Sequence, residues 1–251
     1  MNTKIFNEVS ELYLLWRKAL LGKSGQELRE IAFIQEIIQT FQGQLGSIID
    51  LGGGVGTHAV LLQEAGHQVT IYDRSQKALN IAKTRAPALN LIHGNFENID
   101  VGTDFDSAIC MWSSLSYVDS EVGRQNFYSW MSTHTRHIIV LDQPNFYLYP
   151  QNFNKVYEAE NEKYAMKVFR EWSFDEQFVK RTNYKYEIFD KQSGRVSIED
   201  DQEEQHYVSV DHLQRYLGEL CYLQGVYGGY STLEEFDSLV SERMIAVYVK
   251  S

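Results

Sequence analysis

Short apolar segments alternate with amphipathic segments through the middle of the chain, and this alternation limits the fold more than any other feature. Runs with the length and flanking residues of strands are followed by stretches whose apolar residues recur at helical spacing. The expected strands cover residues 47–51, 68–72, 89–93, 105–111 and 137–141. The expected helices cover residues 57–65, 75–85 and 122–133, and Ser75 is the expected N-cap of the second. This order predicts a doubly wound α/β domain whose parallel sheet has right-handed crossovers.

The segments on either side of this core do not follow the alternation. Two amphipathic helices, predicted over residues 5–21 and 26–41, form an N-terminal helical cap in residues 1–43, and the core itself occupies residues 44–144. A helix with Asp211 as its N-cap and two further strands are expected in residues 210–251, where they complete the sheet.

The alternation stops at Pro144, which indicates an insertion. Residues 145–162 have a partly helical pattern, whereas residues 163–209 alternate aromatic or β-branched residues with polar ones and predict about three antiparallel strands. The acidic run from Glu199 to Glu204 is interpreted as a solvated turn. We therefore expect an inserted antiparallel β subdomain in residues 145–209, which acts as a lid and substrate unit.

A glycine-rich turn, Asp50-Leu51-Gly52-Gly53-Gly54-Val55-Gly56, joins the first core strand to the helix that follows it. Glycines at this point let a ligand approach the backbone closely, in front of a helix N-terminus. Asp50, at the end of the strand, suits a ligand with a cationic amino-acid group. A tight turn that binds no ligand is the alternative interpretation.

The same stretch also fits a dinucleotide-binding fingerprint, since Gly54-Val55-Gly56-Thr57-His58-Ala59 matches G-x-G-x-x-A. In that fingerprint the first glycine comes just after the strand, whereas two glycines here already stand between Leu51 and Gly54. The carboxylate of Asp50 is also poorly suited to a pyrophosphate. Both departures favour S-adenosylmethionine (SAM) over a nicotinamide dinucleotide.

Asp73 supports a nucleoside site at the same edge of the sheet. It follows the second expected strand, and a carboxylate at this point can accept hydrogen bonds from both ribose hydroxyls. NAD and SAM sites share the feature, so Asp73 does not choose between them. The alternative role is that of an acidic residue in a turn before a helix.

Four segments in this order, DLGGGVG, VTIYD, HGNFENI and FDSAICMWSSLSYV, resemble motifs of class I SAM-dependent methyltransferases. The similarity covers roughly residues 15–142. CMWSSLSYV, the leading LLGKSGQELREIAFI and the later QHYVSVDHLQRYLGE are similar to stretches of aminosugar N-methyltransferases, and Asn95-Phe96 resembles a pair of glycine N-methyltransferases. The resemblance implies a Rossmann-like, mostly parallel seven-stranded sheet with an inserted antiparallel β subdomain.

The resemblance also implies which residues bind SAM. The glycines would line its methionine end, Asp73 would hold the ribose, and Asn95 with Phe96 would hold the adenine, although most relatives have Asp in place of Asn95. Met111 is expected beneath the sulfonium, with core packing as the alternative. The implied cofactor-binding residues are Asp50, Gly52, Gly53, Gly54, Gly56, Asp73, Arg74, Asn95, Phe96, Met111 and Trp16.

Two helical residues and two groups farther along the chain are candidates for the chemistry and for acceptor binding. Tyr13 and Trp16 are expected in a lid over the SAM methionine, with plain packing as the alternative, and Tyr13 is also a catalytic candidate. His206 is the candidate general base, since an amine must be neutral to attack; its alternative is a packing role. The candidate acceptor-binding residues are Ser113, Ser114, Tyr117 and Tyr207. No metal site is expected.

Composition limits the partners. The 251 residues carry a formal charge of −11, and such an average field disfavours nucleic acid. Met111-Trp112-Ser113-Ser114 stands where methyltransferases acting on bases or glutamine carry [DN]-P-P-[YF], which disfavours those acceptors too. Cys110 and Cys221 are expected as buried free thiols. Without a signal core or an apolar run long enough for a bilayer, a cytoplasmic protein with no membrane partner is predicted.

The sequence thus predicts a SAM-dependent methyltransferase that acts on a small-molecule acceptor, with an amine as the first choice. Acidic charge favours cationic ligands, and the resemblance to aminosugar enzymes favours N-methylation. Three alternatives stay open: methylation of a small-molecule oxygen, an NAD-dependent oxidoreductase, and a SAM-binding protein without catalysis. The fold does not identify the acceptor, and a homodimer also stays open.

Overall fold

The computed structural model describes residues 10–21, 26–231 and 233–250, and the chain divides into two compact units. The smaller unit combines the N-terminal segment up to Gln26 with Pro150–Tyr207, and the larger unit combines Glu27–Tyr149 with Val208–Ser251. The two helices of the expected cap therefore belong to different units: α2 (Ser10–Leu21) to the smaller one and α3 (Gln26–Phe41) essentially to the larger one. The predicted start of the first helix, before Ser10, lies outside the described residues.

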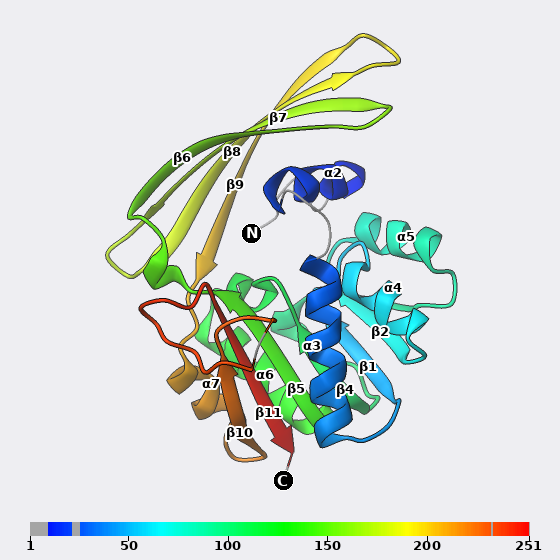
Figure 1. Cartoon of the computed structure of the whole chain (residues 1–251), viewed down its shortest axis with the longest axis vertical. Coiled ribbons are helices and arrows are strands. Elements are labelled where there is room, and N and C mark those ends of the chain that lie inside the picture. The colour runs from blue at the N-terminus through cyan, green and yellow to red at the C-terminus, as the bar shows by residue number, and fades with distance from the viewer. Residues whose placement is uncertain (1–9, 22–25, 232, 251) are drawn as a thin grey trace. The chain divides into compact units, whose positions relative to one another are not determined.

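The larger unit is built on a seven-stranded sheet (Figure 1). The strands follow one another in the order β10 (Cys221–Tyr227), β11 (Arg243–Lys250), β5 (Thr135–Pro144), β4 (Phe105–Cys110), β1 (Ser47–Leu51), β2 (Gln68–Asp73) and β3 (Asn90–His93). The first five strands of the chain pair in parallel, and β11 and β10 add antiparallel pairs at one edge. The predicted mostly parallel, doubly wound sheet is confirmed.

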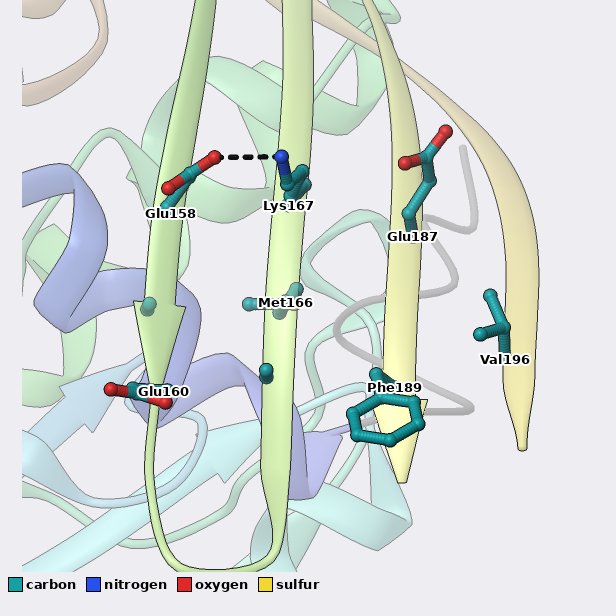
Figure 2. A pocket seen from close by; sticks show the side chains of 9 residues that line it. Glu158, Glu160, Met166, Lys167, Glu187, Phe189 and Val196 are labelled. Atoms are coloured by element: carbon teal, nitrogen blue, oxygen red, sulfur yellow. Dashed lines mark ion pairs between the residues drawn. The ribbon is translucent and has the colours of Figure 1, made fainter. Parts of the chain in front are cut away.

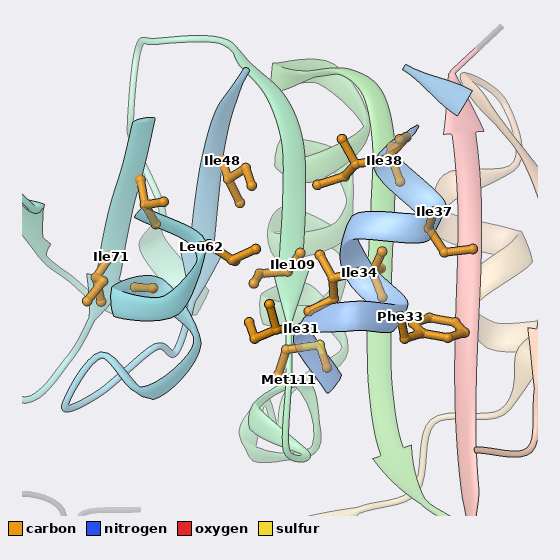
Figure 3. Packing of buried hydrophobic residues seen from close by; sticks show 14 of the residues in the cluster. Ile31, Phe33, Ile34, Ile37, Ile38, Ile48, Leu62, Ile71, Ile109 and Met111 are labelled. Carbon is orange, nitrogen blue, oxygen red and sulfur yellow. The ribbon is translucent and has the colours of Figure 1, made fainter. Parts of the chain in front are cut away.

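Helices pack on both faces of this sheet. The apolar side chains of α3 and α4 (Thr57–Glu64) form one cluster with strand residues on one face (Figure 3). Leu79 and Ala82 of α5 (Gln76–Arg85) belong to the same cluster. On the other face lie α6 (Glu121–His134) and α7 (Val210–Leu217), which contact each other. Both cysteines are buried free thiols within strands, as predicted.

Local capping agrees with the sequence at one helix and differs at another. Ser75 caps α5 as predicted, because its hydroxyl accepts a hydrogen bond from the Ala78 N–H. The predicted cap of α7 is wrong: Ser209, and not Asp211, accepts from a backbone N–H there. Asp211 lies inside the first turn of α7, where an acidic group still interacts favourably with the helix dipole.

The smaller unit consists of a four-stranded antiparallel sheet with α2 packed against it (Figure 1). Its strands, in spatial and chain order, are β6 (Asn152–Glu160), β7 (Tyr164–Phe174), β8 (Val179–Asp190) and β9 (Val196–His206). The inserted antiparallel sheet is confirmed. Residues 145–162 are less helical than expected, because only the short 3-10 helix η3 (Phe146–Leu148) precedes β6.

The interpretation of Glu199–Glu204 as a solvated turn is wrong, since the whole run lies in β9. Strand alternation turns every second residue toward the face that packs against α2, so Asp201 and Glu203 are buried. The Tyr184 hydroxyl on β8 donates a hydrogen bond of 2.7 Å to Glu203. Buried polar groups of this kind need such partners, and the neighbouring strand supplies them.

Lys180 on β8 is a buried base near Glu203 and leads to a prediction on pH. Lys180 is only 1% exposed. Burial lowers its pKa to about 7, although the negative charge of Glu203 acts in the opposite direction. An unfolded chain keeps this proton up to a pH of about 10.4. The unfolded state therefore binds more protons between these values, and stability should rise with pH by up to about 1.4 kcal/mol per pH unit.

We expect Lys180→Met to flatten this rise, measured as the free energy of urea unfolding from pH 7 to pH 10. The matched control is Lys185→Met, which removes an exposed lysine from the same strand and should leave the rise in place. An unchanged slope in Lys180→Met would show that Lys180 is charged in the folded protein throughout this range.

Candidate functional site

The loop between β1 and α4 packs tightly against other residues at Gly52 and leaves open space at Gly54. Gly52 and Gly54 have φ values of +75° and +53°, which residues with a Cβ rarely adopt. A Cβ at Gly52 would lie 2.6 Å from the Cβ of Ser114, whereas a Cβ at Gly54 would meet only a carboxylate oxygen of Asp73, at 3.8 Å. The loop therefore offers an open backbone surface at Gly54, in front of the N-terminus of α4.

Asp73 organises this loop through its carboxylate. One oxygen accepts the Gly54 N–H at 2.9 Å and the other accepts the Ser75 N–H at 2.7 Å. Burial raises the pKa of Asp73, and these two amides lower it. A carboxylate has about four lone-pair sites, so two remain for a ligand that brings hydroxyl donors.

Asp50 lies beneath the same loop. It is buried at the end of β1, and a Cβ at Gly53 would lie 2.6 Å from one of its oxygens. The negative charge of Asp50 also contributes to raising the pKa of the Cys110 thiol, after the larger effect of burial. The site thus has one carboxylate below the glycine loop and another beside it.

Phe96 supplies an apolar face next to the loop. It opens the 3-10 helix η1 (Phe96–Asn98) and stacks on Phe127 at 4.2 Å between ring centroids. Asn95, which caps η1, is exposed, and its carbonyl accepts a hydrogen bond from the Tyr72 hydroxyl at 2.9 Å. Burial, with the charge of Asp100, raises the pKa of Tyr72 to about 12, so this hydroxyl keeps its proton.

Two of the predicted acceptor-binding residues border the cofactor candidates. Ser114, which begins the 3-10 helix η2 (Ser114–Tyr117), has its hydroxyl 3.4 Å from the Gly52 carbonyl. The Tyr117 ring lies 5.8 Å from the Arg74 guanidinium carbon in a cation–π contact. The residues after β4 and β2 therefore meet at one edge of the sheet.

Met111 and Ser113 are buried, which bears on their predicted roles. Met111 belongs to the apolar cluster that also contains Ile31 and Ile109 (Figure 3). Ser113 is buried with a φ of +67°, directly after Trp112, whose φ is +57°. Contact of either side chain with a ligand stays a prediction.

The remaining candidates belong to the smaller unit. Trp16 is buried and meets Tyr157 and Tyr184 edge to face at 5.4 and 6.0 Å, and Tyr13 packs against the same cluster. His206 ends β9 opposite Val179, and Tyr207 meets Phe178 edge to face. The structure thus groups the predicted residues by unit: these four in the smaller one, and those of the glycine loop, β2, η1 and the segment after β4 in the larger one.

Sequence reasoning missed a set of buried ionic groups in the larger unit. Asp142, at the end of β5, accepts two hydrogen bonds of 2.6 Å from Arg243 and one of 2.7 Å from the Trp112 N–H. Glu30 on α3 binds Trp112 and His58. Helical spacing contained a signal for Glu30, since it shares the buried face of α3 with residues three, four and seven positions later.

A separate hollow of about 740 Å³ lies on the four-stranded sheet (Figure 2). Its lining includes the exposed ion pair between Glu158 and Lys167, at 3.0 Å, together with Phe189 and Val196. Register places these residues on the sheet face opposite to the one that packs against α2. None of the predicted site residues lines this hollow.

Comparison with known proteins identifies the segment that carries the glycine loop. Residues 48–136 match the family described as a methyltransferase domain. This segment is similar to methyltransferase domains. It contains the glycine loop, Asp73, Phe96 and the turn after β4, whereas Trp16, His206 and the hollow on the four-stranded sheet lie outside it.

Relatives of the methyltransferase domain extend the comparison. The dTDP-3-amino-3,6-dideoxy-alpha-D-glucopyranose N,N-dimethyltransferase of Streptomyces fradiae is 26% identical over 156 residues, which are 61% of this chain and 58% of that protein. The glycine/sarcosine N-methyltransferase of Aphanothece halophytica is 28% identical over 107 residues, 39% of this chain and 40% of the relative. The chain thus matches only about half of the length of its curated relatives.

A solved structure agrees over the whole chain. The SAM-bound CalS10, an amino pentose methyltransferase from Micromonospora echinaspora, has a TM-score of 0.74 at 16% identity, with 100% of both chains covered. The fold, including the inserted sheet, is that of class I SAM-dependent methyltransferases.

The described residues contain neither a membrane-spanning helix nor a metal-binding cluster. None of the helices in residues 10–21, 26–231 and 233–250 is long and apolar enough to cross a membrane. Within the same ranges, no group of three or more His, Cys, Asp or Glu residues is arranged to hold a metal ion.

Proposed function

We propose that this protein transfers a methyl group from SAM to the nitrogen of a small amine. The observation that carries the proposal is the match of residues 48–136 to a methyltransferase domain. In this segment the Asp73 carboxylate, which can accept further hydrogen bonds, lies next to the open backbone at Gly54. The named relatives that act on nitrogen, an aminosugar enzyme and a glycine/sarcosine enzyme, support the amine. The formal charge of −11 supports a small cationic acceptor over nucleic acid.

The residues of the larger unit suit SAM. Asp73 would hold the ribose with the two lone-pair sites that its loop hydrogen bonds leave, and Phe96 with Asn95 would hold the adenine. The glycine loop above Asp50 would hold the amino-acid end, because a buried carboxylate favours an ammonium group. Arg74, Met111 and Trp16 complete the proposed cofactor-binding residues.

Bound SAM supplies a methyl group on a sulfonium, which an amine nitrogen can attack in line. The protein then has to align the acceptor, exclude water and remove a proton from an ammonium group that arrives charged. We assign alignment to Ser113, Ser114 and Tyr117 after β4 and to Tyr207. We assign proton removal to His206, assisted by Tyr13.

Turnover on a panel of acceptors tests the proposal. With SAM present, we expect methylation of small primary or secondary amines, detected by mass spectrometry, and binding of SAM and S-adenosylhomocysteine but not of NAD by calorimetry. Preferred methylation of phenols or carboxylates would replace the amine by an oxygen acceptor. Binding of SAM with no turnover on any class would contradict an enzymatic role, and binding of NAD alone would contradict the cofactor.

The role of His206 has its own expected result. On an amine that is turned over, His206→Gln should lower the rate about 10²-fold and remove the acidic limb of the pH–rate profile, because the base is lost. The matched control is His137→Gln, an exposed histidine on β5. Equal rates with an unchanged profile in His206→Gln would leave His206 as a packing residue.

A further inference from the structure

Glu30 places a carboxylate inside the apolar core of the larger unit, where both of its oxygens meet groups from other segments. The residue is 0% exposed on α3. One oxygen accepts a hydrogen bond of 2.8 Å from the Trp112 indole N–H, and the other lies 2.7 Å from the His58 Nε2. The rings of His58 and Trp112 also meet edge to face at 5.8 Å. These three residues are the Glu30 cluster.

The two partners of Glu30 come from segments that border the glycine loop. His58 lies in the first turn of α4, directly behind the loop. Trp112 begins the turn after β4. Ser114, in the same turn, packs so closely against Gly52 that a Cβ added at Gly52 would lie 2.6 Å from the Cβ of Ser114. The Glu30 cluster therefore connects the back of the loop with the turn that packs against its front.

The turn after β4 needs such support because of its backbone. Trp112 and Ser113 have φ values of +57° and +67°, and two consecutive residues with a Cβ in this region are unfavourable. Asp142 holds their backbone, since its carboxylate accepts the Trp112 N–H at 2.7 Å and its carbonyl accepts the Ser113 N–H at 3.0 Å. Glu30 holds the Trp112 side chain from α3.

A carboxylate costs free energy to bury, so an apolar residue at this point of α3 would be expected if packing were its only task. We infer that Glu30 is a positioning residue for the SAM site: through Trp112 and His58 it holds the turn after β4 against the glycine loop. The inference rests on the proposed function, because it concerns affinity for the same cofactor.

The test compares Glu30→Ala and Glu30→Gln in the full-length protein. The glutamine can accept from Trp112 and donate to His58, so we expect affinity for S-adenosylhomocysteine close to that of the wild type. The alanine variant should bind S-adenosylhomocysteine about tenfold or more weakly, since the turn loses a charged hydrogen-bond partner. Its KM for SAM should rise more than its KM for the acceptor. Glu36→Ala, which removes an exposed carboxylate from α3, is the matched control.

Thermal unfolding of each variant separates positioning from stability. If Glu30→Ala does not fold, Trp112→Phe removes the indole donor and should give the same loss of affinity. A folded Glu30→Ala or Trp112→Phe that binds S-adenosylhomocysteine as tightly as the wild type would overturn the inference, whatever its melting temperature. A wild-type protein that binds no S-adenosylhomocysteine would instead overturn the proposed function, and the inference with it.

Discussion

Asp73→Ala is expected to bind S-adenosylhomocysteine at least about 10²-fold more weakly than the wild-type protein, because two hydrogen bonds from ribose hydroxyls to a carboxylate are each worth about 1.5–3 kcal/mol. In the structure this carboxylate already accepts the amides of Gly54 and Ser75 and keeps two lone-pair sites for a ligand. Isothermal calorimetry with S-adenosylhomocysteine measures the loss. Asp73→Asn, which keeps one acceptor oxygen, should fall between the two.

The loop hydrogen bonds of Asp73 make a control necessary. Ser75→Ala removes the neighbouring cap of α5 and should cost about 1 kcal/mol of stability while the carboxylate stays in place. Weakened binding in Asp73→Ala together with nearly normal binding in Ser75→Ala would support contact with the ribose. Unchanged affinity in Asp73→Ala would mean that the nucleoside lies elsewhere.

The second large effect is expected at Asp142, whose replacement by alanine should lower the free energy of unfolding by about 3–5 kcal/mol. Asp142 is buried and pairs with Arg243 through two hydrogen bonds of 2.6 Å. Burial alone would lower the pKa of Arg243, and Asp142 reverses this and raises it above its usual value. Without Asp142 the partly buried guanidinium of Arg243 would lose its carboxylate, and the Trp112 N–H would lose its acceptor.

A double-mutant cycle shows whether the pair itself is responsible. Urea unfolding of Asp142→Leu, Arg243→Met and the double variant should show that the double variant recovers much of the stability that each single change removes, because apolar residues of similar size replace both charges. Recovery should be incomplete, since the Trp112 N–H still lacks its acceptor. If the losses of the two single variants simply add, the ion pair does not explain the effect.

Local pattern was sufficient for much of the core. The bounds of α3 and β1 agree with the sequence, because apolar spacing at a period of 3.6 or in short runs reports directly which face is buried. The glycine loop, Asp73 and the cap Ser75 could also be located from the sequence, since each depends on the backbone of a few neighbouring residues. These features need no distant partner to be recognised.

Some side chains could not be placed in this way. Leu28, which helical spacing puts on the buried stripe of α3, is 63% exposed, while Glu30 two positions later is fully buried. Glu30 can be buried because Trp112, in the turn after β4, and His58, on α4, bring a hydrogen-bond donor and a basic ring to its two oxygens. A sequence pattern contains no information on such partners.

Contacts with other segments also decided the burial of the acidic run in β9 and the sheet on which each N-terminal helix packs. Glu203 is expected to be solvated when only its own segment is considered, and Tyr184 and Lys180 on the neighbouring strand make its burial tolerable. Likewise α2 and α3 are consecutive amphipathic helices in the sequence, and they pack on different sheets. Period and turn chemistry determined the elements of this protein, whereas the tertiary structure decided which polar side chains are buried, because a charge enters a core only where a partner from a distant segment meets it.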